Sequence, residues 1–443
     1  MPGTGANASD VAAPPRSLQP RRRPGNVLRL QLDRQLRRLM AYALATYPFA
    51  CVPFLFLFFR QHGMDEAQYG EIVGAYYVAM FVAELPTGVL ADVFGRKRML
   101  VLGPLLLAVG FGTLLLWPTY AGFLLGEVLL GLGHAVLSGP PAAMLYEALR
   151  DHGQEHRFLQ LEARLSALRL VGTGSSFLLG GALVRWLGPE QGYAAAIVAT
   201  CCGNVAAALI ALLLPNGPVR PQLRVQAFVR QVGDELRRPA VLWLLAYWLV
   251  LFALLRFPFH DYQPYLREAG QLVPLLHDPL FVGVLFAAMN LAAAPCSAIV
   301  PRLVHRHGRR FLFWAMPLSL CLSMGVLAYE RHRAGTGDGA PWLVWCGIAM
   351  FFVQQVPFGM HWSLLQEFVN HRIGSATRTT VLSALSLAAR ATYAGINVLL
   401  FSLQHRHGLA YAFAMAATCG GALAFAVLWL RPKGLLRGSG PVG

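Results

Sequence analysis

The chain has 443 residues, of which 56% are hydrophobic and only 13% are charged. Soluble domains usually have about a quarter of their residues charged, and here the apolar residues form long blocks, so a soluble globular domain is excluded. The formal net charge of +16 would suit a nucleic-acid-binding protein, but the basic residues lie in short clusters between the apolar blocks. Clusters of this kind set membrane topology, so we expect a lipid bilayer around the protein and no nucleic-acid partner.

Residues 1–39 precede the first apolar block. Residues 1–26 contain mainly Gly, Pro, Ala and Ser with the run Arg21–Arg23, which predicts a disordered basic tail rather than a signal peptide. The segment Leu28–Arg38 has the pattern of an Arg-rich amphipathic helix that leads into the first span. We expect it to lie on the inner membrane surface.

Twelve apolar blocks follow, and each is about long enough, as a helix, to cross a hydrocarbon core of roughly 30 Å. The predicted spans are 40–59, 70–91, 99–117, 120–148, 164–187, 193–214, 241–264, 280–301, 311–329, 341–366, 379–403 and 409–430. Residues 215–240, rich in Pro and Arg, form a linker, and residues 431–443 form a C-terminal tail. We therefore predict an all-α membrane protein with two six-helix bundles, over 40–214 and 241–430.

The distribution of arginine indicates the orientation of the spans. With the N-terminus inside, the inner segments include the Arg-rich stretches 16–38, 96–98, 220–238, 302–310 and 431–437, whereas the opposite loops hold scattered charges. The positive-inside rule then places both termini in the cytoplasm, with an even number of spans. We expect a multi-pass protein of the plasma (inner) membrane.

Neither the cysteines nor a nucleotide-binding motif indicates a catalytic site in this sequence. All seven cysteines lie inside apolar spans, without a CxxC or Cys/His metal spacing, so we expect small buried hydrophobic side chains and no metal or cofactor. No P-loop pattern occurs, which argues against ATP-driven transport by this chain. A membrane enzyme would need a constellation such as HxxxxD, and none is convincing, so we expect that the protein is not an enzyme.

The loop after the second span carries a glycine–acid–glycine–basic pattern, Glu84-Leu-Pro-Thr-Gly-Val-Leu-Ala-Asp-Val-Phe-Gly-Arg-Lys-Arg98. We expect Gly88 to let a neighbouring helix approach closely and Gly95 to permit a tight turn. Asp92 can accept hydrogen bonds from a helix N-terminus or pair with Arg96. This predicts a latch that forms in one access state and breaks in the other, although Arg96 and Lys97 can also be read as topological anchors.

A degenerate copy follows the eighth span, Pro301-Arg-Leu-Val-His-Arg-His-Gly-Arg-Arg310. Gly308, Arg309 and Arg310 match the Gly-Arg-Lys of the first copy, while His305 stands at the position of its acid. A second repeated pattern is Arg164-Leu-Ser at the fifth span, which corresponds to Arg378-Thr-Thr at the eleventh. The repeats predict two homologous halves.

These motifs resemble the signature of the major facilitator superfamily, with Val93 at a site that is usually basic. Two further stretches, 145–149 and 370–383, resemble a bacterial drug or solute exporter subgroup. Drug/proton antiporters commonly carry Gly-Pro in the fifth span where this chain has Ser176 and Phe177, and Glu127 stands near a usually basic position. The resemblance implies two pseudo-symmetric bundles, a monomer, and a secondary transporter that moves a small organic solute by alternating access. It also favours proton coupling and export, that is, efflux by an antiporter.

By the same resemblance, spans one, four, seven and ten line the central cavity. Polar side chains recur along three of these spans at helical spacing, which predicts that they point inward, towards protein or water. The candidate substrate or proton residues are Glu127, His134, Arg256, His260, Asp261, Gln354, Gln355 and His361. Our hypothesis is that Glu127 or Asp261 exchanges a proton and that Arg256 holds an anionic group or neutralises a carboxylate. The alternatives are a fixed Arg–carboxylate pair and histidines bonded to backbone carbonyls.

Glu84 and Glu147 lie near the inner ends of their spans. We expect them to form gate ion pairs with Arg150, Arg164 or Arg378 rather than to contact cargo. The rival functions are a transport-inactive sensor or scaffold of the same fold and, less favoured, an integral membrane enzyme.

Overall fold

The computed structural model describes residues 26–216, 237–372 and 378–432, with the single residues 230, 233 and 435. Within these ranges, the side chains of residues 26–30, 85, 89, 92, 159, 370–372 and 378–380 are not described. All regular secondary structure in the described residues is helical. The predicted disordered tail, most of the predicted linker and most of the C-terminal tail fall outside them.

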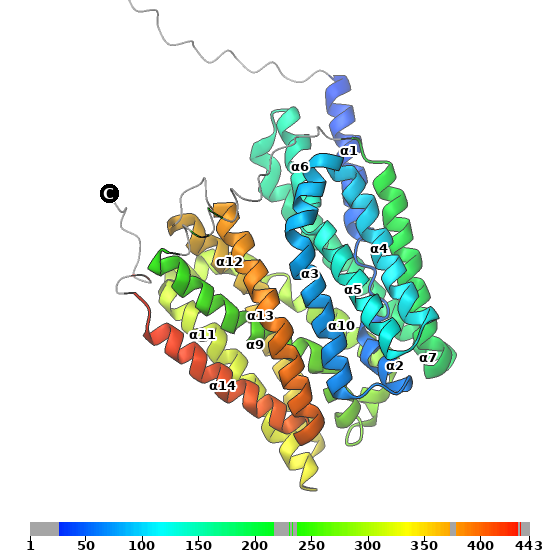
Figure 1. Cartoon of the computed structure of the whole chain (residues 1–443), viewed down its shortest axis with the longest axis vertical. Helices are drawn as coiled ribbons and strands as arrows, with labels where there is room; N and C mark the ends of the chain where they lie inside the picture. Colours follow the sequence, from blue (N-terminus) through cyan, green and yellow to red (C-terminus); the bar gives the residue numbers. More distant parts are fainter. Residues whose placement is uncertain are drawn as a thin grey trace, which may run out of the picture.

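The first half of the chain folds into one bundle (Figure 1). Its elements are α1 (Asn26–Ala45), η1 (Val52–Phe54), α2 (Leu55–Gln61), α3 (Glu66–Phe94), α4 (Arg96–Leu116), α5 (Tyr120–Leu137), α6 (Pro140–Asp151), η2 (Glu155–Arg157) and α7 (Phe158–Leu212). The second half forms the other bundle. Its elements are α9 (Pro239–Ala269), η3 (Pro274–His277), α10 (Pro279–Ala293), α11 (Cys296–Gly335), α12 (Pro341–Arg372), α13 (Arg378–His407) and α14 (Leu409–Trp429).

Four glycines with positive φ turn the chain between neighbouring spans in one residue each. Gly95 (φ 85°, ψ 147°) separates α3 from α4, and Gly308 (φ 79°, ψ 159°) bends α11. Gly188 (φ 76°, ψ 167°) bends α7, and Gly408 (φ 84°, ψ 169°) precedes α14. Residues other than glycine rarely adopt this backbone conformation. The equivalent places of these turns make the two halves structurally similar, as the duplicated motif predicted.

Proline residues and polar caps define other helix ends. Asp65 caps α3, accepting a hydrogen bond from the Gln68 backbone N–H at 2.8 Å, while the Gln68 side chain accepts one from the Asp65 N–H. Asp278 caps α10 in the same way through the Phe281 N–H. Pro140 stands at the start of α6 and divides the fourth predicted span into α5 and α6.

Eight helical stretches within the described residues are long and apolar enough to cross a membrane. Two of them, Glu155–Leu212 with 58 residues and Pro279–Gly335 with 57, are about twice the length that one crossing needs and contain the turns at Gly188 and Gly308. The arrangement is consistent with the twelve predicted spans. Large apolar side chains lie on the outside, as expected for a lipid-facing surface.

The predicted surface helix at 28–38 is instead the first part of α1, which continues into the first span as one helix. Leu32, Leu36 and Leu39 are buried, and the Arg38 guanidinium donates to the Leu213 carbonyl at 2.5 Å. The apolar face of the segment therefore packs against protein, because α7 lies beside it.

Two helix pairs join the halves, α3 with α13 and α7 with α10. Glycines permit close approach: a Cβ added at Gly70 of α3 would lie 2.4 Å from Cβ of Phe401, and one at Gly181 of α7 would lie 2.7 Å from the Pro279 carbonyl oxygen. In Figure 1 the blue and cyan helices of the first half lie on one side of this junction and the orange and red helices of the second half on the other.

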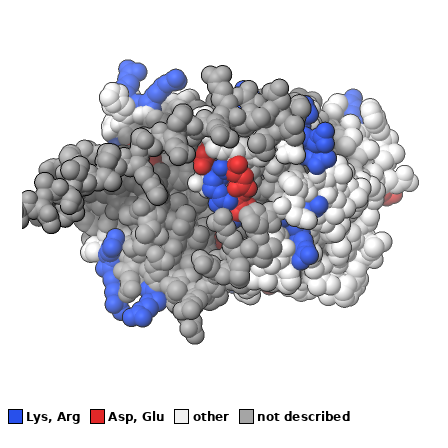
Figure 2. All heavy atoms as spheres, turned by 90° about the horizontal axis from the view of Figure 1, so that it is seen from above, with Lys and Arg blue, Asp and Glu red and all other residues white. Residues whose placement is uncertain are grey.

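We call the end of the bundle with the Gly95 and Gly308 turns the basic end, and the end with the Gly188 and Gly408 turns the opposite end. Figure 2 looks onto the basic end and shows Lys and Arg side chains of the described residues at several places on it, with Asp and Glu mainly in one central cluster. This distribution agrees with the clusters seen in the sequence.

Candidate functional site

The chain is non-helical for several residues between α1 and η1, midway along the first predicted span. Tyr47 in this break has φ 61°, the only positive φ of a non-glycine residue in the described part of the chain. Its carbonyl accepts a hydrogen bond from the Thr173 hydroxyl at 3.1 Å. A bulky residue in this conformation is strained and needs surrounding contacts to hold it.

The other half of the protein satisfies part of this broken helix. The Gln263 side chain of α9 accepts a hydrogen bond from the Phe56 N–H at 2.8 Å and donates one to the Val52 carbonyl at 2.7 Å. Backbone groups freed by a break in a membrane span need such partners.

His134 of α5 lies against this break. Its ring stacks on Tyr47 with 5.4 Å between centroids and lies 5.5 Å from the ring of Tyr76 on α3. His134 Nδ1 lies 2.9 Å from the Leu130 carbonyl oxygen, so this nitrogen carries the hydrogen.

Tyr77 of α3 links the two halves. Its hydroxyl lies 3.1 Å from His260 Nε2 of α9, and its ring packs edge-on against Tyr393 of α13 at 4.9 Å. Phe252 of α9 contacts both tyrosine rings, at 6.5 Å and 5.8 Å. The ring contacts therefore continue from the first half into the second.

Arg256 and His361 extend these contacts to α12. The Arg256 guanidinium lies 5.4 Å from the ring centre of Phe252 and 5.5 Å from that of Phe358. His361 lies 5.7 Å from Phe358 and stacks on Trp248 of α9 at 5.4 Å. We call this continuous set of rings, from Tyr47 and His134 to Trp248 and His361, the aromatic–histidine chain.

Gln354 and Gln355 form hydrogen bonds within the second half. The Tyr262 hydroxyl donates to Gln354 at 3.0 Å, and the Gln355 amide donates to the same hydroxyl at 3.0 Å. The Gln354 amide also donates to Ser323 at 3.0 Å. Because all of these groups are buried and partnered, the two glutamines stabilise packing of α9, α11 and α12.

Two buried carboxylates on membrane-spanning helices have no cationic partner among the described residues. Asp261 is fully buried, and neither of its oxygens has a hydrogen-bond partner among the described residues, although Gln404 lies nearby. Glu127 is 6% exposed and makes no ion pair within the described part of the chain. Neither residue forms the fixed Arg–carboxylate pair considered from the sequence. An isolated buried carboxylate is costly when ionised.

Glu84 and Glu147 both form ion pairs among the described residues, but not with Arg150 or Arg164; the side chain of Arg378 is not described. Glu84 of α3 pairs with Arg390 of α13, a contact between the halves. Glu147 pairs with Arg96 at 3.2 Å within the first half. Arg164 is exposed and makes no ion pair within the described residues.

The second half has an equivalent of the Glu147–Arg96 pair. Arg309, beside the Gly308 turn, donates two hydrogen bonds through Nε and one through Nη2 to Glu367 of α12, at 2.6–3.0 Å. The duplicated motif thus places an Arg after each turn and a Glu at the end of α6 or in α12.

The remaining motif residues lie at the basic end. A Cβ added at Gly88 would meet no described atom within 4 Å, so the expected close helix approach at Gly88 is not seen among the described residues and stays a prediction. Lys97 is partly exposed and Arg310 is exposed. The side chains of Asp92 and Arg378 lie outside the described set.

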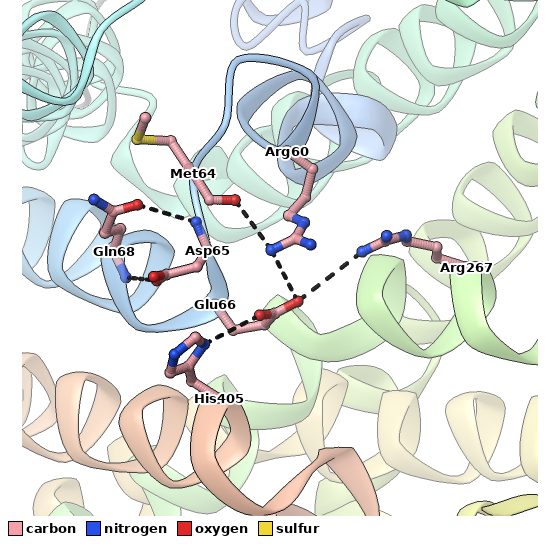
Figure 3. A network of polar contacts seen from close by, with 7 residues as sticks. All are labelled: Arg60, Met64, Asp65, Glu66, Gln68, Arg267 and His405. Atoms are coloured by element: carbon pink, nitrogen blue, oxygen red, sulfur yellow. Dashed lines mark hydrogen bonds and ion pairs between the residues drawn. The ribbon is translucent and has the colours of Figure 1, made fainter.

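A polar cluster at the opposite end is shown in Figure 3. Glu66, the first residue of α3, lies 3.2 Å from Arg60, 4.0 Å from Arg267 of α9 and 3.5 Å from His405 Nδ1 of α13. We call these four residues the Glu66 cluster. It joins the two halves at this end.

Several of these residues could not be expected from the sequence. Tyr77, Tyr393 and Arg390 lie in spans that we did not expect to line the cavity, and no motif marks Glu66 as part of a cluster. Glu367 could have been found, because the duplicated Arg309 implies a partner equivalent to Glu147. Within the described residues, no group of three or more His, Cys, Asp or Glu side chains could hold a metal ion.

The chain is similar to known transporters. A family model described as Major Facilitator Superfamily matches residues 39–396. The "Inner membrane transport protein YajR" of Escherichia coli (strain K12) is 24% identical over 334 residues, which cover 73% of this chain and 66% of that protein. An "Uncharacterized transporter" of Buchnera aphidicola subsp. Schizaphis graminum (strain Sg) is 26% identical over 120 residues, 27% of this chain and 28% of that protein. The matches thus span less than two thirds of the length of either relative.

Solved structures have the same fold. A crystal structure of the nucleoside transporter NupG superposes with a TM-score of 0.71 at 12% identity, covering 93% of this chain and 100% of that one. A D-xylose-proton symporter superposes with a TM-score of 0.67 at 14% identity, covering 92% and 98%. At these identities the likeness shows the fold alone.

Proposed function

Since the chain belongs to the Major Facilitator Superfamily, we propose that this multi-pass membrane transporter moves a small organic solute by alternating access through the aromatic–histidine chain. The proposal depends on one observation. The rings of the aromatic–histidine chain continue across both halves of the protein, through the contacts of Tyr77 with His260 and Tyr393. A site shared by two bundles can face either side of the membrane in turn when the bundles rock.

We propose that the basic end faces the cytoplasm, because Lys and Arg accumulate on cytoplasmic loops. Among the described side chains, the hydrogen bonds, ion pairs and ring contacts that join the halves run from the Glu66 cluster to the level of the Glu84–Arg390 pair and the Asn290–Leu170 hydrogen bond. Because these described contacts lie towards the end opposite the basic end, they support an inward-facing state that is closed at the outer end.

We propose that Asp261 exchanges the coupling proton. It lies on α9 between His260 and Gln263, whose side chains contact residues of the first half. A buried carboxyl group without a cation is stable when protonated, and water that enters as the halves separate would allow it to ionise. Glu127 is the second candidate.

For the direction and the coupling of transport, the exporter-like motifs favour export by proton antiport. The fold does not select between antiport and symport, since one similar structure is a proton symporter. A single chain contains both halves of the proposed site, so we expect a monomer to be sufficient for transport. A transport-inactive sensor would not need an ionisable Asp261, and a membrane enzyme would need a catalytic constellation.

Counterflow in proteoliposomes tests the function, with a panel of labelled organic solutes at two proton gradients. We expect exchange of at least one solute, and accumulation of that solute only when a gradient is present. Asp261→Asn should retain counterflow but lose gradient-driven accumulation, whereas Asp338→Asn in an exposed pair with Arg333 serves as the control. If Asp261→Asn accumulates solute as the wild type does, Asp261 is not the proton carrier. If no solute exchanges, the sensor reading replaces transport.

A further inference from the structure

Arg256 is held between two aromatic rings in a way that leaves its hydrogen-bond donors available. Phe252, one helical turn earlier on α9, and Phe358 on α12 each lie within cation–π distance of its guanidinium. Stacking on aromatic rings uses the faces of a guanidinium, whereas its N–H groups point outward in its plane. These N–H groups match the two oxygens of a carboxylate, or those of a phosphate or sulfonate.

Among the described residues, Arg256 forms no ion pair with a carboxylate. Glu84 of α3 pairs with Arg390 instead. The two isolated carboxylates, Glu127 and Asp261, form no ion pair with Arg256 either. A part-buried cation within a membrane span is costly unless an anion or water compensates it.

Arg256 lies at the centre of the aromatic–histidine chain. Phe252, on which its guanidinium lies, contacts the rings of Tyr77 in the first half and Tyr393 in the second. A ligand group bound to Arg256 would therefore lie among side chains of both bundles. An anion at this position can also hold the bundles together while the site changes sides.

His134 and His361 do not supply the positive charge that an anionic group needs. Their Nδ1 atoms lie 2.9 Å and 2.6 Å from backbone carbonyl oxygens, so these nitrogens donate to the backbone. In a neutral ring the remaining nitrogen accepts and does not donate. Among the described side chains of the aromatic–histidine chain, Arg256 is the cationic donor and the buried Trp248 Nε1, without a hydrogen-bond partner there, is a neutral donor, while the ring faces suit a planar apolar body.

We propose that the central site selects organic anions with a planar or aromatic body, and that Arg256 binds the anionic group while the surrounding rings contact the body. The proposal deepens the proposed transport function and rests on it for the physiological role of the site. Equilibrium binding by the full-length protein tests selectivity without requiring flux.

The experiment uses four anionic probes: 2-naphthoate, benzoate, benzenesulfonate and phenyl phosphate. Each is compared with an uncharged counterpart, which is 2-naphthamide, benzamide, benzenesulfonamide or phenol, respectively. Binding to the purified chain is measured by calorimetry and by the shift of the thermal midpoint. At least one anion should bind about tenfold more tightly than its uncharged counterpart, as a charge-assisted pair of hydrogen bonds provides. Arg256→Gln should remove this difference, while Arg256→Lys retains part of it and Arg310→Gln, at an exposed arginine, leaves it unchanged.

Two results would overturn the proposal. One is that no anion of the panel binds more tightly than its uncharged counterpart. The other is that Arg256→Gln, with a thermal midpoint equal to that of Arg310→Gln, retains the preference. A failed transport assay with an intact, Arg256-dependent preference would instead reject transport and leave the binding site standing.

Discussion

Adding one methyl group at Gly70 should open the opposite end of this transporter, the end that we propose faces outward. In the structure, a Cβ at Gly70 of α3 would lie 2.4 Å from Cβ and 3.1 Å from Cγ of Phe401 on α13. Cβ atoms do not approach so closely, and the Phe401 Cβ cannot rotate away because it is bonded to its backbone. Helices α3 and α13 must therefore separate, which also weakens the 2.8 Å hydrogen bond from Asn397 to the Gly70 carbonyl.

The size of the effect follows from the cost of overpacking, about 1–3 kcal/mol. If the outward-open state relieves this clash, Gly70→Ala should raise the ratio of outward-open to outward-closed protein by roughly 5- to 150-fold. Alanine also favours a helix over glycine by about 0.5–1 kcal/mol, but this gain is present in both states and cancels. Gly112→Ala on α4, where nothing lies within 4 Å of the added Cβ, has the same helix gain without the clash and is the matched control.

Pulsed electron resonance between two spin labels measures the populations. Gln61 at the end of α2 and Gln271 after α9 are exposed, lie at the outer end and belong to different halves. In a background from which the seven native cysteines have been replaced, Gly70→Ala should increase the long-distance fraction, and Gly112→Ala should not. Equal distributions for the two variants would refute the idea that α3 and α13 separate when the outer end opens.

Three further changes give smaller, distinct results. Glu66→Gln removes two partly exposed contacts between the halves, each of which contributes about 0.2–1 kcal/mol of stabilisation. It should therefore raise the same long-distance fraction only a few-fold. A rise as large as that of Gly70→Ala would contradict this. Glu367→Gln removes the described counter-charge and one of the two acceptor oxygens of the largely buried Arg309. It should lower the thermal midpoint more than Glu147→Gln, which removes a single contact at 3.2 Å; equal midpoints would contradict the difference. Tyr77→Phe keeps the ring but loses the hydrogen bond to α9 and leaves His260 Nε2 unpaired. It should therefore lower the thermal midpoint and also weaken ligand binding about threefold to tenfold in calorimetry, whereas unchanged binding would remove the hydroxyl from the site.

The spans and the turns of the fold could be predicted because their causes are local. Apolar length defines a span, and a glycine before basic residues marked the turns at Gly95 and Gly308. The turns at Gly188 and Gly408 have the same backbone geometry, but no basic motif follows them, so only the structure revealed them. The break at Tyr47 does have a local signal, because proline at position 48 disfavours a helical conformation for the residue before it. The positive φ of Tyr47 has no such signal, since contacts with other helices maintain it.

The site was only partly predictable. Polar periodicity found Arg256, His260 and Asp261, since an inward-facing polar stripe on an apolar helix is a local pattern. It misassigned the partner of Glu84, because Arg390 lies 306 residues away and only the crossing of α3 and α13 brings the two together. It also treated Gln354 as a cargo contact equal to His361, although hydrogen bonds to Tyr262 and Ser323 occupy it. Spacing gives the face of a helix, whereas the partner depends on packing between helices.

The central claim is that two rigid bundles rock about a shared site, and distances at both ends of the wild-type protein test it most directly. The outer pair is Gln61 and Gln271; the inner pair is His156 and Arg306, both exposed at the basic end and in different halves. When each pair is recorded in lipid, with and without a bound anion from the probe panel, a shift of the outer pair to longer distance should accompany a shift of the inner pair to shorter distance. Lengthening of both pairs together, or movement of one while the other stays fixed, would contradict the account.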